Sequence, residues 1–403
     1  MWEKDVNIHE VKEIRLKNNV YFGVGAINKI YDITKEIKGK SVDKVIVVSG
    51  KNAYKSTGAW DVVEKALIEN GIGYINYTGV TPNPTTENID TATSMAKDFG
   101  AKAVIAIGGG SVIDTGKSVA ILLKYPEKNA SELYECKFAP EEAATIIAIN
   151  TTHGTGTEAN RFAVATILEK DYKPVIAYDC IYPTYSIDDP QLAIKLPKNQ
   201  TIYVSIDAVN HVIEAATTKA ASPYSITLAK ETIRLVAKYL PIAIAKPEDL
   251  EARFFLMYAA MIAGTSFDNG LLHYTHALEH PLSAVKPNLS HGLGLAMLLP
   301  AVVKYIYKEK CQTLSDILAP IIPDLNATPA GGQQCAEKLE EWLVSVGATS
   351  KLSNEGFTES DVEKLTELAF VTPSLDLLLS MAPNEATRGI VSAIYKESLK
   401  FYK

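Results

Sequence analysis

Side chains that could bind a metal ion are concentrated in one part of this chain. Five of its seven histidines lie between residues 211 and 291, and an aspartate precedes the first of them by four positions. Residues four apart on a helix point to the same side, so such a pair can bind one ion together. Neutral imidazoles and a carboxylate suit Fe(II) or Zn(II). Each histidine alone could be an ordinary core or surface residue, but the whole group predicts a metal site: Asp207, His211, His273, His276, His280 and His291.

A run of glycines suggests a second kind of chemistry. The glycine turn, Gly108-Gly109-Gly110-Ser111, follows a strand-like segment and precedes a helical one. Glycine lets the backbone approach a pyrophosphate, and the start of the next helix offers free N–H groups and a positive dipole end. A tight strand–helix turn could also explain these glycines. Their position at the carboxyl end of a strand favours a phosphate site, although they follow the third expected strand and not the first, as in the usual Rossmann fingerprint.

A second loop, TTHGTGTE at residues 151–158, follows the next expected strand and is called the threonine loop. Its hydroxyls and flexible glycines suit hydrogen bonds to ribose or phosphate oxygens, while the alternative is a turn in which Ser or Thr caps the next segment. The carboxyl ends of neighbouring parallel strands lie at one edge of a sheet, so both loops can line one crevice. Together they favour a dinucleotide.

The elements that must position these residues differ between the two halves of the chain. Strands are expected at 42–50, 73–80, 101–111 and 143–152, with helices between them; one helix should begin at Thr85 or Thr86 and end at Gly100. This alternation predicts a parallel, doubly wound α/β sheet, closed by a hairpin of residues 162–170 and 173–181. From about residue 200 the pattern is helical, with prolines at 190, 197, 223 and 241 expected to separate the segments. We therefore predict two domains, residues 1–192 and 193–403.

The overall composition excludes several classes of protein. The chain of 403 residues has 47% apolar and 22% charged residues and a net charge of −7, which argues against nucleic acid or an anionic membrane as the main partner. Its four cysteines lie far apart without a C-x-x-C motif, so neither a disulfide framework nor a thiolate zinc site is expected. The first residues contain no apolar leader and no apolar run of about 18 residues occurs. We expect a cytoplasmic protein.

Five motifs occur in a fixed order: GGGSVIDTGK, TTHGTGTE, DAVNHVIEA, HALEHPL and SHGLGLAMLLP. With them the chain resembles the iron-containing (group III) alcohol dehydrogenases, whose fold is similar to that of dehydroquinate synthase. The resemblance covers nearly the whole chain. It implies an N-terminal dinucleotide-binding α/β domain and an all-helical C-terminal domain with the metal in the cleft between them. It also implies a dimer and four metal ligands: Asp207, His211, His276 and His291.

The resemblance implies hydride transfer between a small primary alcohol or aldehyde and NAD(P). The metal would act as a Lewis acid on the substrate oxygen. His280 would lie near the nicotinamide, as a proton relay or positioning residue, with a supporting hydrogen-bond role as the alternative. The implied ion is Fe(II), although the ligands would bind Zn(II) at least as tightly. The expected cofactor contacts are Gly50, Lys51, Asn52, Gly108, Gly109, Gly110, Ser111, Asp114, Thr151, Thr152, Thr155 and Lys173.

Three positions depart from the family pattern. Many NAD-using members have an acidic residue where this chain has Gly50, followed by Lys51. Loss of the anion that binds the ribose 2′-hydroxyl, with a cation nearby, favours NADP, unless Lys51 is only a solvated lysine. His153 replaces a small residue and could contact the cofactor or substrate or point outward. The pair Asn160-Arg161 also differs, and the sequence gives no account of it.

Other functions remain open from the sequence. A glycerol dehydrogenase or dehydroquinate synthase type of enzyme would act on polyols or phosphorylated substrates and would need additional basic residues near the metal. The stretch around LLHYTHALEHPL is mostly apolar, which favours simple alcohols. A hydroxyacid–oxoacid transhydrogenase is a further variant. A non-catalytic metal-storage or metal-sensing protein would explain the histidines but not the glycine turn and threonine loop.

Overall fold

A six-stranded parallel sheet dominates the first half of the chain in the computed structural model, which describes residues 14–402. The expected strands are confirmed, although the third stops at Gly108 because a helix begins at Gly110. Two short strands, the first and last strands of this sheet in chain order, were not expected. Residues 1–13, where we expected no leader, lie outside the described part. In the spatial order β1-β8-β5-β4-β2-β3, the strands are Val20–Phe22, Tyr185–Asp188, Thr145–Asn150, Ala103–Gly108, Lys44–Gly50 and Gly73–Val80.

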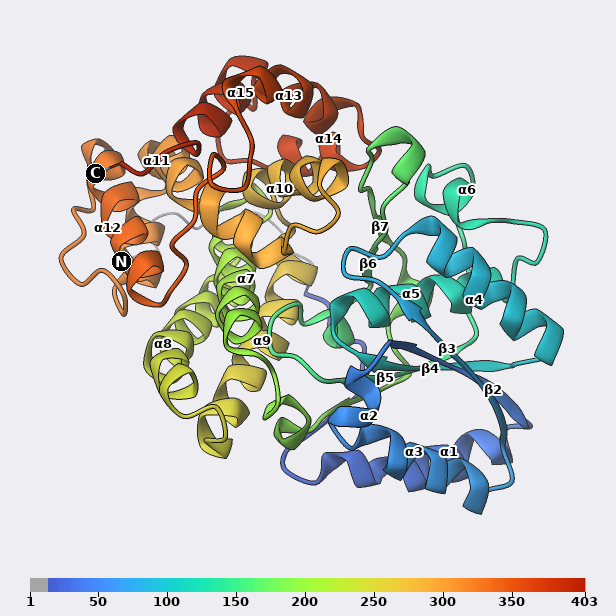
Figure 1. Ribbon diagram of the computed structural model, residues 1–403. Coiled ribbons are helices and arrows are strands. Elements are labelled where there is room, and N and C mark those ends of the chain that lie inside the picture. Colours follow the sequence, from blue (N-terminus) through green and yellow to red (C-terminus); the bar gives the residue numbers. More distant parts are fainter. Residues whose placement is uncertain (1–13, 403) are drawn as a thin grey trace.

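Helices cover both faces of this sheet, as a doubly wound fold requires. Val45 and Val47 of β2 pack with α1 and α3, whereas the alternate residues Ile46 and Val48 pack with α4 and α5. Figure 1 shows the two helical layers on opposite sides of the strands. Thr85 caps the start of α4 and Gly100 its end, as expected. The helices are α1 (Lys29–Gly39), α2 (Ala53–Ser56), α3 (Ala59–Glu69), α4 (Thr86–Phe99), α5 (Gly110–Leu122) and α6 (Ala130–Tyr134).

The expected hairpin is present as a separate pair of short antiparallel strands, β6 (Phe162–Val164) and β7 (Val175–Ala177). It leads towards β8 and then into the helical half. Short 3-10 helices occur in the connections: η2 (Ala26–Asn28), η3 (Thr157–Ala159), η4 (Leu168–Lys170), η5 (Asp179–Ile181), η6 (Pro190–Ala193), η7 (Pro329–Gly331) and η8 (Glu359–Asp361).

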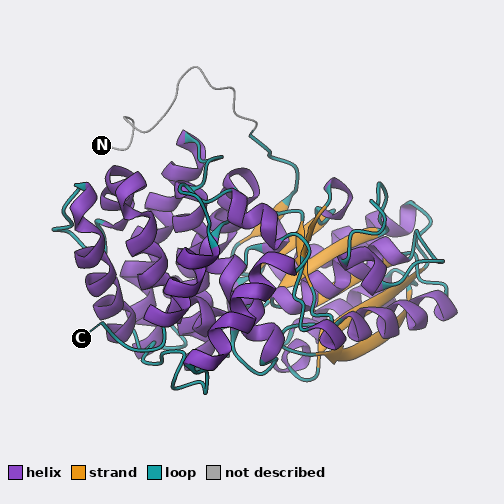
Figure 2. Ribbon diagram, turned by 90° about the horizontal axis from the view of Figure 1, so that it is seen from above, coloured by secondary structure: helices purple, strands orange, loops and turns teal. Residues whose placement is uncertain are grey.

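From Lys198 onward the described chain is helical and encloses its own apolar core. Figure 2 shows these helices gathered at one end of the molecule and the strands at the other. Pro241 does not separate two helices, contrary to expectation, because α8 continues through it to Ala245. Among residues 14–402, none of the helices has the length and apolar character needed to cross a membrane. The helices are α7 (Lys198–Thr217), α8 (Pro223–Ala245), α9 (Leu250–Gly270), α10 (Tyr274–Val285), α11 (His291–Leu318), α12 (Gly332–Ser345), α13 (Val362–Val371), α14 (Leu375–Ser380) and α15 (Arg388–Glu397).

Candidate active site and metal centre

Three helices bring the four expected metal ligands together. Asp207 and His211 lie one turn apart on α7, His276 is on α10, and His291 is the first residue of α11. The Asp207 Oδ1 atom is 3.5 Å from His211 Nε2, 3.5 Å from His276 Nε2 and 3.9 Å from His291 Nε2. One carboxylate oxygen therefore faces three imidazole nitrogens.

These separations fit a shared metal ion better than direct hydrogen bonds. Asp207 Oδ1 and His276 Nε2 are buried without a hydrogen-bond partner, and leaving such groups unpaired is costly. Two ligand atoms, each about 2.1 Å from a tetrahedrally coordinated ion, are about 3.4 Å apart. Ligand atoms of Asp207, His276 and His291 all lie within 4.8 Å of one another, and His211 adds a nitrogen on the same Asp207 oxygen. Three nitrogens and one oxygen suit a divalent transition metal.

Glycines in the SHGLG motif allow this approach of the helices. A Cβ atom on Gly292 would lie 2.1 Å from the carbonyl oxygen of Tyr203 on α7, and one on Gly294 would lie 2.7 Å from Cγ of Glu279 on α10. Any side chain at either position would push α11 away from its neighbours. These glycines place His291 beside Asp207.

Two buried glutamates orient the metal-facing imidazoles. The Nδ1–H group of His276 donates to Glu214 Oε2, and that of His291 donates to Glu279 Oε2. Glu214 also accepts from the backbone N–H of Thr275 at 2.6 Å. With Nδ1 protonated, each ring turns the lone pair of its Nε2 atom towards Asp207, the tautomer that a metal ligand needs.

The charges of the site favour ionised carboxylates and a neutral His211, whereas for His276 burial is outweighed by the carboxylates of Glu214 and Asp207, which raise its pKa to about 9. Burial raises the pKa of Asp207, but the facing His211 and other imidazoles outweigh it and lower that pKa to about 2. Burial likewise opposes ionisation of Glu214, and the imidazoles of His276 and His273 overcome it, which lowers its pKa to about 2. Burial lowers the pKa of His211 to about 3, so its ring stays neutral.

Lys173, expected to contact the cofactor, lies buried beside this centre. Its Nζ atom donates to Ser283 Oγ at 2.7 Å and Asn83 Oδ1 at 2.8 Å, and lies 3.4 Å from Glu279 Oε2. Its backbone carbonyl accepts a hydrogen bond from His280 Nδ1 at 2.8 Å. Lys173 therefore holds both His280 and the carboxylate that orients His291.

A second group of possible ligands, Glu279, His280 and His291, is less suited to an ion. The Lys173 ammonium already neutralises Glu279 there, and His280 has one ring nitrogen bonded to a carbonyl. Burial, followed by the Lys173 charge, lowers the pKa of His280 well below its ordinary value. The group around Asp207 is therefore the better metal site, and His280 remains as a neutral imidazole next to it.

The glycine turn and the threonine loop contact one another, as expected from neighbouring strands. Gly108 of β4 lies opposite Asn150 of β5, and the Thr151 N–H donates to the Gly108 carbonyl at 3.0 Å. A Cβ atom on Gly109 would be 2.7 Å from Thr152 Cγ2, and one on Gly110 would be 2.4 Å from Thr155 Cγ2. The backbone of the turn thus fits against the loop, with the N-terminus of α5 at the same edge.

The remaining expected cofactor residues have different surroundings. Ser111 lies in the first turn of α5, and Gly50, Lys51 and Asn52 lie at the end of β2, the neighbour of β4. Asp114 is half-buried and accepts hydrogen bonds from Thr157 Oγ1 at 2.7 Å and the Val164 N–H at 3.1 Å. Burial raises its pKa to about 6. Asp114 thus ties α5 to the threonine loop and to β6.

His273 has a local structural role. It is fully buried at the start of α10, where Nδ1 accepts from the Tyr274 N–H at 2.7 Å and Nε2 lies 2.8 Å from Thr217 Oγ1. Both ring nitrogens are used within the protein. The sequence left this histidine unassigned, and the structure places it at a helix terminus.

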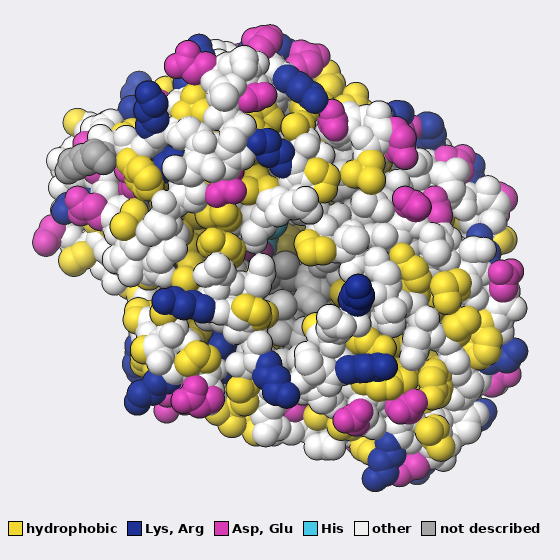
Figure 3. Space-filling view, in the orientation of Figure 1, with side chains coloured by type: hydrophobic (Ala, Val, Ile, Leu, Met, Phe, Trp, Pro, Cys, Tyr) yellow, Lys and Arg dark blue, Asp and Glu magenta, His cyan; other side chains and the backbone are white. Residues whose placement is uncertain are grey.

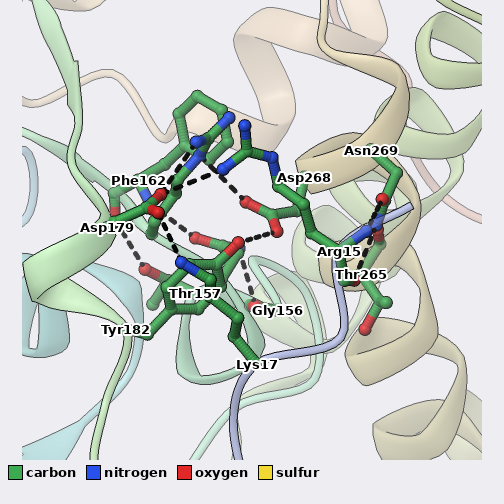
Figure 4. A network of polar contacts seen from close by, with 12 residues as sticks. Arg15, Lys17, Gly156, Thr157, Phe162, Asp179, Tyr182, Thr265, Asp268 and Asn269 are labelled. Atoms are coloured by element: carbon green, nitrogen blue, oxygen red, sulfur yellow. Dashed lines mark hydrogen bonds and ion pairs between the residues drawn. The ribbon is translucent and has the colours of Figure 1, made fainter. Parts of the chain in front are cut away.

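The structure also accounts for Arg161, which had no explanation from sequence. Its guanidinium pairs with Asp179 at 3.0 Å and lies 3.6 Å from Asp268 on α9. Arg15 reaches the same Asp179 carboxylate, and its backbone N–H donates to Asn269. Figure 4 shows Arg15 and Asp179 in this network beside Asp268 and Asn269 of α9. Arg161 therefore belongs to a network that connects the two halves of the chain.

The site opens towards a hollow between the halves. Figure 3 shows a depression in one face, in which a histidine side chain is visible. His291 is the most exposed of the four expected ligands, with 27% of its side chain accessible. Phe267 stacks on the His211 ring with centroids 4.4 Å apart, and Phe162 packs on Phe267. An apolar wall thus borders one metal ligand.

Comparison with known proteins identifies this arrangement. Residues 17–190 match the family described as "Iron-containing alcohol dehydrogenase", and residues 201–399 match "Fe-containing alcohol dehydrogenase family, C-terminal". The chain belongs to the iron-containing alcohol dehydrogenase family. The resemblance seen in the sequence motifs is confirmed, and membership implies iron and a nicotinamide cofactor.

Similar members of the iron-containing alcohol dehydrogenase family match between three quarters and nearly all of the chain. The long-chain primary alcohol dehydrogenase AdhA of Thermoanaerobacter ethanolicus is 60% identical over 99% of this chain and 100% of its own length. The NADPH-dependent butanol dehydrogenase of Clostridium saccharobutylicum is 32% identical over 76% of this chain and 77% of its own. The crystal structure of an NADH-dependent butanol dehydrogenase A from Thermotoga maritima has a TM-score of 0.89 at 30% identity. The match covers 97% of this chain and 99% of that one. These relatives include both cofactor types.

Sequence reasoning missed Glu214 and Glu279 in this iron-containing alcohol dehydrogenase. Each lies three residues after a histidine ligand, in the segments HVIE and HALE. A charged residue on the same helix face as a ligand, within an otherwise apolar stretch, was the available signal. A glutamate on a helix is more often exposed to solvent, so this spacing alone does not mark either residue.

We expect Glu279→Gln to weaken metal binding by about 10- to 100-fold, because the amide cannot supply the negative charge that supports His291. Metal affinity should be measured by competition with a chelator. Glu340→Gln is the matched control, since Glu340 is a similarly buried carboxylate that pairs with Lys351 away from the metal ligands. Equal metal affinity in the two variants would contradict the orienting role of Glu279.

Proposed function

We propose that this chain is a metal-dependent dehydrogenase that interconverts primary alcohols and aldehydes, with Fe(II) as its metal and NADP(H) favoured over NAD(H). The observation that carries the proposal is the buried Asp207 oxygen, unpartnered and surrounded by three imidazole nitrogens, in a chain that also holds a glycine turn against a threonine loop. The two features together suit hydride transfer, whereas the metal ligands alone would also suit hydrolysis or storage. In this proposal residues 1–192 bind the dinucleotide and residues 193–403 bind the metal and substrate.

Each group of residues has a distinct role in the proposed reaction. The metal would be held by Asp207, His211, His276 and His291. When bound, it would stabilise the negative charge on the substrate oxygen. The turn at Gly109 and the hydroxyls of the threonine loop position the dinucleotide so that its nicotinamide meets the substrate carbon. These roles combine positioning with charge stabilisation, the two contributions that a protein adds to cofactor chemistry.

His280 is proposed to hold or pass on the proton of the substrate hydroxyl. Its Nδ1–H is fixed on the Lys173 carbonyl, which leaves Nε2 with a lone pair. Its ring centroid is 5.8 Å from that of the ligand His291, so it adjoins the metal site. Burial, followed by the Lys173 charge, lowers its pKa and keeps the ring neutral, with the Nε2 lone pair available as a hydrogen-bond acceptor.

A primary alcohol with an apolar chain is the proposed substrate. The rings of Phe267 and Phe162 border His211 on one side, and the Lys173 ammonium is occupied by protein oxygens. A polyol or phosphorylated substrate would require free polar or basic groups there. We expect kcat/KM for butanol to exceed that for glycerol by at least about a hundredfold, as unpaired hydroxyls in an apolar site are costly. Metal-loaded protein that turns over glycerol as well as butanol would contradict this assignment.

NADP is the proposed cofactor because no acidic side chain occupies the end of β2. A Cβ atom on Gly50 would have only the Val80 carbonyl nearby, at an ordinary 3.6 Å, so an aspartate fits there. We expect the native protein to prefer NADP over NAD by about tenfold in kcat/KM, and Gly50→Asp to reverse that preference, because the carboxylate repels the 2′-phosphate and binds the 2′-hydroxyl. Lys51→Ala tests the cation separately. A native preference for NAD would refute this choice.

We further propose that the enzyme is a cytoplasmic dimer. Among residues 14–402 the sheet ends at β1, which pairs with β8 alone, and apolar side chains near this edge are exposed: Ile14, Leu16 and Val24. A second copy could cover them by pairing along the edge strand. The four cysteines are free, which suits a reducing compartment.

A further inference from the structure

His153 belongs to the threonine loop, yet its ring contacts the helical half of the chain. It is buried, with Nε2 2.9 Å from Arg253 Nη1 on α9 and Nδ1 3.3 Å from Ser205 Oγ on α7. A guanidinium can only donate, so Nε2 accepts and the proton lies on Nδ1, which donates to Ser205. One neutral imidazole therefore joins the loop to two helices.

Arg253 is an unusual partner for this histidine. It is fully buried, and its Nη1 also donates to Thr201 Oγ1 on α7 at 2.8 Å, while Nε donates to the Pro247 carbonyl at 2.9 Å. Within residues 14–402 no carboxylate pairs with it, and its Nη2 atom has no hydrogen-bond partner. A buried cation without a counter-charge costs stability. Its presence therefore calls for a role other than stabilising the core.

The glycines of the threonine loop bring its backbone onto the same two helices. A Cβ atom on Gly154 would lie 2.6 Å from Cβ and the carbonyl oxygen of Val204 on α7. One on Gly156 would lie 2.5 Å from the Ala260 carbonyl of α9, and Gly156 has a positive φ of 58°. These glycines are thus required for contact between the loop and the helices, a role separate from any contact with a phosphate.

The loop consequently lies between the two halves of the proposed active site. On one side Thr152 and Thr155 contact the glycine turn, and on the other His153 reaches Ser205, two residues before the proposed ligand Asp207. We propose that His153 and Arg253 are positioning residues that fix this loop on α7 and α9, and so set the distance between the bound nicotinamide and the metal-held substrate. The inference rests on the proposed function.

His153→Ala is expected to affect nucleotide binding and hydride transfer but not metal binding. Loss of both ring contacts frees the loop, so the dissociation constant for NADPH should rise about five- to tenfold. Small displacements of reacting atoms reduce rates strongly, and kcat should fall about 10- to 100-fold. The deuterium isotope effect on kcat with 1,1-dideuterated butanol should increase, because hydride transfer becomes the slower step. Metal content should match that of the native protein.

Three further variants separate positioning from folding. His153→Gln offers one acceptor and one donor and should restore most of the lost affinity and rate. Arg253→Lys keeps the charge but lacks the planar fork that reaches both His153 and Thr201, so it should behave like His153→Ala. Lys351→Met removes a buried lysine that pairs with Glu340 away from the loop. It should lower thermal stability without raising the isotope effect.

The NADPH titration should be followed by nicotinamide fluorescence on the metal-loaded enzyme. A native enzyme that binds neither NADPH nor NADH would overturn the proposed function itself; if it binds only NADH, the same variants are compared with NADH. A native enzyme that binds NADPH, with His153→Ala unchanged in dissociation constant and isotope effect, would overturn the positioning role alone. Should His153→Ala not fold, the comparison of His153→Gln with Arg253→Lys decides, and equal behaviour of these two would also overturn it.

Discussion

His276→Ala is expected to abolish metal retention and alcohol oxidation together. His276 faces the Asp207 oxygen through Nε2 and is held from behind by Glu214, so its removal deletes a ligand and leaves two buried carboxylates without their imidazole. Lewis-acid stabilisation of an oxyanion contributes several kcal/mol. We therefore expect kcat/KM for butanol to fall by at least about a thousandfold, with metal content measured on anaerobically purified protein.

Thr232→Val provides the control for this substitution. Thr232 is as deeply buried as His276 but lies on α8, where its hydroxyl bonds only to the Ala259 carbonyl at 3.4 Å. This variant should keep its metal and most of its activity. If His276→Ala retained full activity, the assignment of the metal ligands would be wrong.

Gly109→Val is expected to impair the nucleotide half of the site selectively. Even the first carbon of a side chain at this position would lie 2.7 Å from Thr152, so valine must push the glycine turn and the threonine loop apart. We expect the dissociation constant for NADPH to rise about a hundredfold, equivalent to about 2.7 kcal/mol. The affinity for the metal should remain unchanged, because the ligands lie on α7, α10 and α11.

Gly39→Val is the matched substitution, since a Cβ atom at Gly39 would meet nothing within 4 Å. It should leave NADPH binding intact. The two active-site variants should therefore have opposite defects. His276→Ala should bind nucleotide but not metal, and Gly109→Val should bind metal but bind nucleotide weakly. Loss of both ligands in Gly109→Val would indicate misfolding instead, and unchanged NADPH binding would remove the turn from the cofactor site.

The sequence pattern predicted the long elements better than the short ones. β2, β3, β4 and β5 each carry six or more residues of a recognisable apolar pattern, and α4 has capping residues at both ends. β1 and β8 contain three and four residues, too few for a periodic pattern, and become strands because the sheet edge offers them backbone partners. Pro241 misled the prediction because tertiary packing can keep a helix continuous through a proline.

The site shows the same division between local and long-range information. The spacing of Asp207 and His211 indicates a shared helix face, and the structure brings His276 and His291 to them. The partners Glu214 and Glu279 could not be assigned, since which glutamate is buried depends on how helices pack. The glycines of the threonine loop were interpreted as flexibility that suits hydrogen bonds to ribose or phosphate, whereas Gly154 and Gly156 contact helices.

Transfer of deuterium from 1,1-dideuterated butanol to the cofactor tests the central claim most directly. With the metal-loaded native enzyme and NADP, we predict one deuterium on C4 of the nicotinamide for each aldehyde formed, and no transfer after the metal has been removed by a chelator. Aldehyde formed without deuterium in the cofactor, or transfer that persists fully in the metal-free protein, would contradict metal-assisted hydride transfer at Asp207, His211, His276 and His291.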